Sequence, residues 1–536
     1  MEPIACWEPG AELPAFRPAE IVALAQRVRE SVSVVRETST GLVGLGSGGS
    51  VHPYAAAGSA GYGVLASLPG QYPEWLGDRS FLEAHRVRFA YVVGEMANGI
   101  ATARMVSAAA RAGLLGFFGA GGLSLARIEE GVAAIRAEIG DGGASWGCNL
   151  IHSPAEPRLE EATVDLFLRA GVRRASASAF MSLSPHVVWY AYRGATADAQ
   201  GRPRRANHVF AKVSRPEVAE AFIRPAPERI LTQLVQQGKL TELEAKVGSR
   251  LPVAQDVTAE ADSGGHTDNR PLGVLLPVLC LLRDRIQTDL RYEQPVRVGA
   301  AGGLGNPSAV AAAFGLGASY VLTGSVNQAA VEAGVAPDAK ALLARAGMAD
   351  VAMAPAADMF EQGVRLQVLK RGTMFPGRAA RLYDLYRRYE SLEAIPDADR
   401  ASLEKQIFGQ PLETVWQETL AFWQAREPEQ ARRAQADPHH RMALVFRWYL
   451  GKASRWAIDG TPGRTQDYQV WCGPAMGAFN AWVRGSFLEV VENRTVAQIA
   501  LNLLEGATAV QRAQQLRSFG VPVPAEAFDF RPRMLC

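Results

Sequence analysis

The amino-acid sequence predicts an α/β protein built on a TIM (β/α)8 barrel, with an N-terminal appendage and a C-terminal α-helical region. Between residues 88 and 323, eight short apolar runs that read as strands alternate with helical segments. Repeated strand–helix units imply parallel strands, and eight of them favour closure into a barrel. We therefore divide the chain into an appendage at 1–80, a barrel at 81–365 and a helical region at 366–536.

The appendage is predicted to contain a short helix at 19–29 and a β-branched strand at 31–35. The run at 41–49 formally meets the GxGxxG spacing of dinucleotide-binding loops. Such a loop must open a helix, but Pro53 interrupts the chain there, and no acidic residue follows about twenty positions later in a βαβ context. We therefore predict a loop at 41–49 and no Rossmann site.

The barrel segment provides one strand for each of the eight positions. These strands are expected at 89–93, 114–118, 145–151, 172–180, 208–213, 253–261, 296–301 and 319–323. Helices are expected at 102–112, 125–139, 158–170, 272–290 and 307–314, with one or two more within 217–248.

The helical region differs in composition from the barrel. Aromatic and charged residues rise, glycine falls, and helical periodicity dominates. Helices are expected at 378–392, 400–408, 412–426, 442–449 and 495–519. We expect this region to pack on the barrel or on a partner protein.

Composition excludes several classes of protein. The net charge of +2 argues against a dedicated nucleic-acid binder, and no apolar stretch is long enough to span a bilayer. The five cysteines are widely separated and form no CxxC pair, which indicates reduced thiols in a cytoplasmic protein without a zinc site. The first 16 residues carry acids and prolines, which is not typical of a signal peptide.

Two glycine-rich loops follow the last two predicted strands. Gly302 and Gly303 lie in one, and Gly324 and Ser325 lie in the other. In barrels, a phosphate commonly binds at these two loops on exposed backbone N–H groups, where a side chain would block its approach. The alternative is that these glycines only form tight turns.

His266 follows the sixth predicted strand, within an acidic, glycine-rich loop. This position places it at the carboxyl face of the barrel, where barrel active sites lie, and an imidazole there can transfer a proton near neutral pH. The alternative is a structural histidine. Asp268 and Glu260 are the candidates to orient it, and His152, after the third strand, is the second candidate histidine.

At these residues the sequence resembles nitronate monooxygenase (2-nitropropane dioxygenase)-like flavoproteins. The shared elements, in the same order, are Gly121-Gly122, Gly147-Cys148-Asn149-Leu150, Gly264-Gly265-His266, Gly302-Gly303 and Thr323-Gly324-Ser325. Longer strings resemble the PfaD-type trans-acting enoyl reductases of polyunsaturated fatty acid and polyketide synthases. They lie at 260–271, 321–328, 353–360, 369–375, 446–450 and 468–479.

The resemblance implies an FMN-containing oxidoreductase that takes hydride from NADPH and reduces enoyl thioesters through flavin N5. It places the FMN phosphate at Gly302, Gly303, Gly324 and Ser325. It places Gly121, Gly122 and Asn149 near the ring, with Gly264 and Gly265 beside the cofactor and Lys212 as a contact. His266 is the candidate proton donor, although in the monooxygenase branch the matching histidine is a base.

The resemblance also implies a substrate carried by an acyl carrier protein of a synthase complex. Because carrier proteins are acidic, a basic docking patch is expected. Arg202, Arg204 and Arg205 form one candidate cluster, and Arg432, Arg433 and 439–441 form another; an ordinary solvated surface is the alternative for each. A nitronate-oxidising enzyme and a non-catalytic assembly subunit stay open as other functions, and a homodimer stays open as the oligomeric state.

Overall fold

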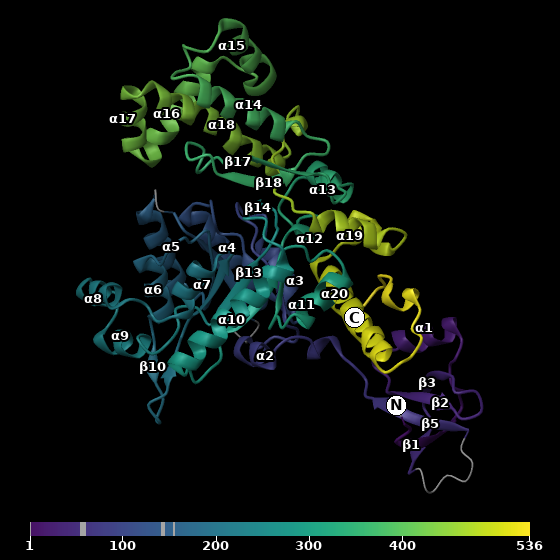
Figure 1. The fold of residues 1–536 in the computed structure, drawn as a ribbon. Coiled ribbons are helices and arrows are strands. Elements are labelled where there is room, and N and C mark those ends of the chain that lie inside the picture. The colour runs from purple at the N-terminus through teal and green to yellow at the C-terminus, as the bar shows by residue number, and fades with distance from the viewer. Residues whose placement is uncertain (1, 54–60, 141–144, 154–155, 536) are drawn as a thin grey trace.

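Eight parallel strands close into a barrel in chain order, which confirms the predicted fold class (Figure 1). The computed structural model describes residues 2–53, 61–140, 145–153 and 156–535. The barrel strands are β6 (Tyr91–Val93), β7 (Leu115–Phe118), β8 (Trp146–Ile151), β9 (Arg174–Ser178), β12 (His208–Val213), β13 (Asp256–Glu260), β15 (Arg297–Ala301) and β16 (Val321–Thr323).

Helices pack around the barrel between its strands (Figure 1). They are α3 (Ala103–Arg111), α4 (Leu125–Ile139), α5 (Pro157–Arg169), α6 (Pro185–Tyr192), α7 (Pro216–Ile223), α8 (Glu228–Gln236), α9 (Glu242–Gly248), α10 (Leu272–Leu290), α11 (Pro307–Gly315) and the short α12 (Ser325–Gln328). A small hairpin, β10 (Thr196–Ala197) and β11 (Pro203–Arg204), extends from one side. The periodicity of the sequence did not indicate α6.

Aromatic side chains fill the middle of the barrel. Phe210 lies in edge contact with both Phe117 and Tyr320, with ring centroids 5.0 and 5.8 Å apart. Glycine makes room for these rings, because Gly147 and Gly299 lie so close to Phe117 and Tyr320 that a Cβ atom would clash. The interior is therefore a packed core, and a ligand has access only at the mouth.

A buried ionic cluster closes the amino-terminal end of the barrel. Helix α2 (Arg79–His85) brings His85 beneath the strands, with its Nε2 3.0 Å from Asp256 Oδ2. Arg297 donates to both carboxylate oxygens of Asp256, over 2.6 and 2.9 Å. His208 lies beside them, and its ring nitrogens fall within 4.8 Å of ligand atoms on His85 and Asp256. At the base of a barrel, such a cluster serves stability.

The appendage forms an antiparallel sheet in the order β3-β2-β5-β1-β4. Its elements are β1 (Ala5–Glu8), α1 (Pro18–Gln26), β2 (Val32–Glu37), β3 (Val43–Ser47), β4 (Ser50–His52) and β5 (Tyr62–Leu68). The prediction of a loop at 41–49 is wrong, because Val43–Ser47 form strand β3, which pairs along its length with β2. Glycine is used here for close packing, since a Cβ atom on Gly46 would lie 2.7 Å from the Trp7 indole.

Adding a methyl group at Gly46 is expected to destabilise this sheet by about 1–3 kcal/mol, because the Trp7 ring has no room to move. Chemical unfolding of Gly46→Ala, followed by Trp fluorescence, measures the change. Gly61→Ala is the matched control, because no heavy atom lies within 4 Å of the Cβ position at Gly61. Equal stability of the two variants would show that the sheet does not need a glycine at Gly46 to pack against Trp7.

The C-terminal region is largely helical, as predicted, and its first helices lie beyond the carboxyl ends of the barrel strands (Figure 1). Its helices are α14 (Phe375–Arg388), α15 (Asp397–Leu403), a π-helical turn (Glu404–Phe408), α16 (Leu412–Arg426), α17 (Pro428–Ala436), α18 (Pro438–Asp459), α19 (Ala475–Val483) and α20 (Val496–Ser518). One more helix, α13 (Pro337–Ala344), lies between the last barrel strand and this region. Short 3-10 helices occur at Pro73–Trp75, Thr465–Asp467, Phe487–Glu489, Val491–Asn493 and Ala525–Phe528.

A small sheet joins the barrel to the helical region, and the sequence did not predict it. It consists of β14 (Gly265–His266), β18 (Arg365–Leu369) and β17 (Val351–Pro355), in that order and antiparallel. Figure 1 shows β17 and β18 between the barrel and helices α14 to α18.

The long helix α20 links the barrel to the N-terminal sheet. It packs on α11 and α3 of the barrel and on α1 of the appendage. Its Ala513 and Leu516 belong to the same buried apolar cluster as Val34 and Leu45 of the sheet. Arg29 donates to the buried Glu505 of α20 over 2.8 Å, so the contact includes an ion pair.

Among the described helices, none has the length and apolar character needed to cross a membrane. Cys6, Cys148, Cys280 and Cys472 are free thiols, and Cys536 lies outside the described residues.

Candidate active site at the barrel mouth

The two loops predicted to hold a phosphate are open. Gly303 and Gly324 follow β15 and β16, and a Cβ atom at either position would meet no heavy atom within 4 Å. Gly302 turns toward β13 with φ of +88°. Ser325 Oγ accepts a hydrogen bond of 3.1 Å from the Gly473 amide, which ties the C-terminal region to this loop. No side chain of the described residues fills the space beside Gly303 and Gly324, which is the arrangement that a phosphate bound on backbone N–H groups would need.

Asn149 and the Gly121–Gly122 loop lie together on the neighbouring part of the mouth. Asn149 is 2% exposed, and its amide nitrogen donates to Ser176 O over 3.1 Å and to Ser178 Oγ over 2.9 Å. Its Oδ1 atom faces Gly121, where a Cβ atom would approach it to 2.5 Å. Glycine is therefore required at Gly121 for the loop to pass this close to the amide oxygen.

Lys212 projects from the end of β12 into a group of carboxylates. Its Nζ atom lies 2.9 Å from Glu260 Oε1 and 3.2 Å from Glu95 Oε1. Burial acts to lower the pKa of Lys212, but the two carboxylates outweigh it and hold the pKa above its usual value. The barrel mouth therefore contains a fixed ammonium group. Glu95 was not predicted from the sequence, where its only signal is the position of an acid just after the first strand.

His266 lies in β14, and a different acid orients it from those expected. Its Nε2 atom is 3.2 Å from Asp358 Oδ1, and its ring lies edge-on to Trp471 at 6.0 Å. The predicted orienting acids are both engaged elsewhere: Asp268 accepts from Ser214 and Arg215, and Glu260 pairs with Lys212. Asp358 comes from the connection between β17 and β18, far away in the sequence.

Gly264 and Gly265, just before His266, allow β14 to pack closely against the C-terminal region. A Cβ atom on Gly264 would lie 2.7 Å from the Cys472 amide nitrogen. Gly265 has φ of +85°, and a Cβ atom there would approach the Trp471 ring to 3.1 Å. Both glycines therefore serve this packing in the structure, and a place for them beside a cofactor stays a proposal.

Burial acts to lower the pKa of His266, but the carboxylates of Asp358 and Glu260 raise it above its usual value. The charged form thus contributes stability that is complete below the unfolded pKa of about 6.5 and is lost as pH rises through the folded pKa. We expect Asp358→Asn to lower the pKa of His266, because the variant removes the carboxylate that pairs with Nε2 and contributes most to raising that pKa.

Nuclear magnetic resonance titration of the imidazole measures this pKa directly. Asp268→Asn is the matched control, because the Asp268 carboxylate binds Arg215 and does not contact His266. If Asp268→Asn lowered the pKa of His266 and Asp358→Asn did not, the acid that orients His266 would be Asp268 and not Asp358.

His152, the second candidate histidine, lies directly after the carboxyl end of β8 and pairs with a carboxylate. Its Nδ1 atom lies 2.9 Å from Glu160 Oε2 of α5, and its ring stacks on Phe180. Glu160 also accepts from the Ser153 amide and the Ser184 hydroxyl. The Glu160 carboxylate thus connects the loops after the third and fourth barrel strands. His152 is part of this connection, so its role is structural.

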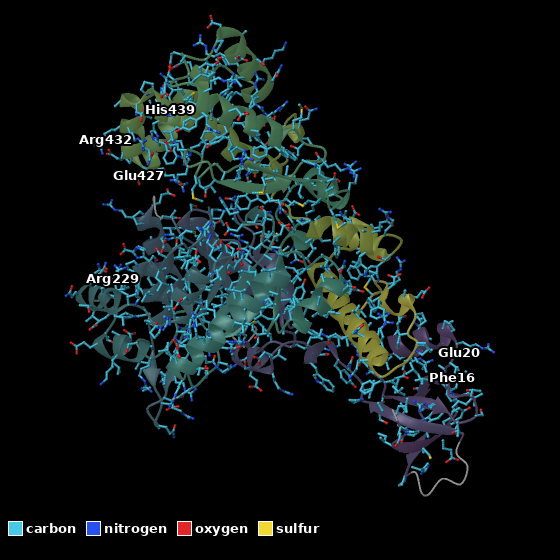
Figure 2. The ribbon with its side chains drawn as sticks, in the orientation of Figure 1. Phe16, Glu20, Arg229, Glu427, Arg432 and His439 are labelled. Atoms are coloured by element: carbon cyan, nitrogen blue, oxygen red, sulfur yellow. The ribbon has the colours of Figure 1, made fainter. Side chains whose placement is uncertain are left out.

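Neither candidate basic cluster is a set of free cations. Arg202 and Arg204 both pair with Asp198, and Arg205 donates to the backbone carbonyls of Pro252 and Val253. In the helical region, Arg432 pairs with Glu429, Arg433 with Glu361 and Asp437, and Arg441 with Glu393 and Glu413. Figure 2 shows Arg432 and His439 in this region together with Glu427.

The chain is similar in sequence to proteins of known pathways. Residues 389–468 match the inserted helical domain of [acyl-carrier-protein] S-malonyltransferases. The chain is 48% identical over 450 residues to one of the polyunsaturated fatty acid synthase subunits of Thraustochytrium sp., a match that covers 83% of the chain and 30% of that relative. It is 43% identical over 449 residues to the polyketide biosynthesis protein PksE of Bacillus subtilis, which covers 84% of the chain and 58% of PksE. The chain thus spans less than two thirds of these relatives.

A solved structure matches most of the chain. The enoyl reductase domain of MlnA, from the macrolactin biosynthesis cluster of Bacillus amyloliquefaciens, superposes with a TM-score of 0.79 at 37% identity, and the match covers 83% of this chain and 99% of that domain. Together with the barrel and the sequence relatives, this match shows that the chain belongs to the PfaD-type enoyl reductase family, a branch of the nitronate monooxygenase-like (β/α)8 barrels.

Proposed function

We propose that this protein is an FMN-dependent enoyl reductase that takes hydride from NADPH and acts in trans on enoyl thioesters of acyl carrier proteins. The observation that carries the proposal is the open backbone at Gly303 and Gly324, at the ends of the last two barrel strands. Side-chain-free loops at this position of a barrel are suited to a phosphate group. The names of the relatives support a polyketide or polyunsaturated fatty acid synthase as the setting.

In this proposal Gly302, Gly303, Gly324 and Ser325 hold the phosphate. The residues beside the ring are Gly121, Gly122, Asn149, Lys212, Gly264 and Gly265. When bound, FMN supplies the redox chemistry, accepting hydride from NADPH and delivering it to the β-carbon of the enoyl thioester. The Lys212 ammonium is held in place at the mouth by Glu260 and Glu95, so its remaining N–H donor capacity has a fixed direction.

His266 is the proposed donor of the proton to the α-carbon. Its raised pKa supports this role, because the protonated imidazole is then more populated near neutral pH. Asp358 holds the ring through Nε2, so the other ring nitrogen is the one available for proton transfer. The free state of the described cysteines supports a reducing, cytoplasmic setting.

The function can be tested with purified protein under anaerobic conditions. We expect a yellow protein whose flavin absorbance bleaches on addition of NADPH and returns on addition of crotonyl-pantetheine. Bleaching by a nitronate, followed by recovery with oxygen but not with the enoyl thioester, would favour an oxidase of the monooxygenase type. A colourless protein that takes up no FMN would favour an assembly subunit without redox activity.

A further inference from the structure

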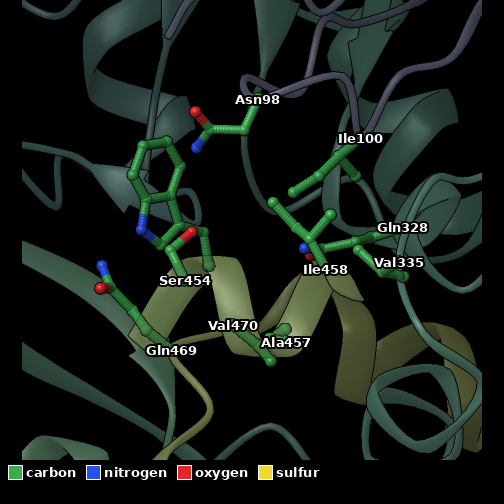
Figure 3. A pocket seen from close by; sticks show the side chains of 10 residues that line it. Asn98, Ile100, Gln328, Val335, Ser454, Ala457, Ile458, Gln469 and Val470 are labelled. Carbon is green, nitrogen blue, oxygen red and sulfur yellow. The ribbon is translucent and has the colours of Figure 1, made fainter. Parts of the chain in front are cut away.

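Two loops on the rim of the barrel mouth lie side by side. One follows β6 and carries Ile100, and the other connects α12 to α13. Figure 3 shows Ile100 facing Gln328 and Val335 where the two loops meet. Thr102 Oγ1 donates to Glu332 O over 2.7 Å, which fixes one loop to the other. Because β6 and β16 both end at the carboxyl face of the barrel, both loops lie at its mouth.

Two cations beside these loops share one carbonyl oxygen. Arg104, the second residue of α3, donates through Nη2 to Val331 O, and Lys340 of α13 donates through Nζ to the same atom over 3.1 Å. Arginine has five N–H donors and lysine has three, so each side chain keeps donors free for a ligand. In the part of the chain that the structure describes, neither cation forms an ion pair with a carboxylate.

The approach of these two cations is unfavourable without an anion. Lys340 is half-buried, and this burial and the nearby Arg104 guanidinium hold the pKa of Lys340 below its usual value. The Glu332 carboxylate acts in the opposite direction, but it already accepts a hydrogen bond of 3.0 Å from the Val496 amide. An anion between the two cations would remove their repulsion. The positive end of the α3 dipole, beside Arg104, would attract it further.

A phosphate monoester suits this pair of cations. It carries nearly two negative charges at neutral pH, and its oxygens accept charge-assisted hydrogen bonds from arginine and lysine. The phosphodiester that links a carrier protein to its arm has only one negative charge. The FMN phosphate has its proposed place at the loops after β15 and β16. The proposed reaction brings one more phosphate monoester to the mouth, which is the 2′-phosphate of NADPH.

We propose that Arg104 and Lys340 bind the 2′-phosphate of NADPH and thereby select NADPH over NADH. This inference rests on the proposed function. The adenosine end of the donor then lies on the rim between α3 and α13. Loss of either cation lowers the preference for NADPH and leaves the use of NADH unchanged, because NADH has no phosphate at the 2′ position for these cations to contact.

The test uses FMN-loaded protein and calorimetry with two probes, adenosine 2′,5′-bisphosphate and AMP, which differ only in the 2′-phosphate. Lys340→Met and Arg104→Gln should each weaken binding of the bisphosphate about tenfold, the loss of one charge-assisted hydrogen bond, and leave AMP binding unchanged. Each single variant leaves the Val331 carbonyl with its other donor, so both variants should fold.

Arg229→Gln is the matched control. Arg229 is an exposed cation on α8 (Figure 2), and Figure 1 shows α8 well apart from α13. The control should bind both probes like the wild type. Steady-state kinetics with crotonyl-pantetheine gives a second readout: the KM for NADPH should rise about tenfold in Lys340→Met and Arg104→Gln, whereas kcat and KM with NADH should not change.

Three results would overturn the inference. Unchanged affinity of the folded variants for adenosine 2′,5′-bisphosphate would show that the 2′-phosphate binds elsewhere. Equal losses for the bisphosphate and AMP would show that the two cations do not recognise the 2′-phosphate. Weaker binding of crotonyl-phosphopantetheine alone would assign them to the carrier arm. If NADPH or NADH bleaches the wild type, these results count against the cation pair alone; if neither does, the proposed function fails first.

Discussion

A valine in place of Gly324 is expected to weaken FMN binding at least about 100-fold, a loss of about 2.7 kcal/mol. The Cβ position at Gly324 points into open space at the end of β16, where the proposed phosphate would lie. A branched side chain there would fill that space and keep phosphate oxygens away from the backbone N–H groups. Quenching of FMN fluorescence during titration of cofactor-free protein measures the affinity.

Gly315→Val is the matched control for this prediction. Gly315 also has open space at its Cβ position and no positive φ, but it is the last residue of α11, at the opposite end of the barrel from the mouth. The control should bind FMN normally and unfold at nearly the wild-type temperature. If Gly324→Val retained FMN as tightly as the control, the phosphate would have to bind at other loops, and the main support for a flavin here would be lost.

Replacing Asp256 with alanine is expected to destabilise the protein by about 3–5 kcal/mol, because it leaves the Arg297 guanidinium buried without its counter-charge. Arg297 is 2% exposed and Asp256 is fully buried, so neither can turn to solvent. Burial acts to raise the pKa of Asp256, but Arg297 and His85 hold it below its ordinary value. Its contribution is therefore present above about pH 4 and is lost as pH falls through the folded pKa.

Guanidinium unfolding at neutral pH measures this change. Asp284→Ala is the control, because Asp284 is exposed and its ion pair with Arg283 on α10 should contribute less than about 1 kcal/mol. A double variant, Asp256→Leu with Arg297→Met, should recover part of the lost stability, since the Arg297 charge is removed together with its partner. Equal losses in Asp256→Ala and Asp284→Ala would show that the cluster at the base of the barrel is not important for stability.

Most of the barrel could be predicted from sequence, because its elements have strong local signals. The strand at His208–Val213 and the helices at Leu125–Ile139 and Leu272–Leu290 have the predicted bounds. Their apolar residues repeat with one clear period over their whole length, and turns bound them. The glycines after β15 and β16 were found for a related reason: parallel strands of a barrel all end at the same face, so order alone placed these loops together.

The parts that failed depend on contacts between distant segments. The two-residue strand β14 is too short for any periodicity, and it forms only because β18, about a hundred residues later, pairs with it. Asp358 reaches His266 through that same sheet, and proximity in sequence instead favoured Asp268. The glycines of β3 suggested a loop. They are needed in the strand because the Trp7 ring occupies the space that a side chain at Gly46 would have taken.

The contact between α20 and the N-terminal sheet has a consequence for how the chain is made. Ribosomes extend a chain at about 5–20 residues per second, so α20 emerges roughly 20–90 seconds after the sheet residues that it covers. During that interval the apolar face that includes Val34 and Leu45 has no Leu516 to cover it. The strands of this sheet therefore stay exposed to chaperones and proteases until α20 has left the ribosome.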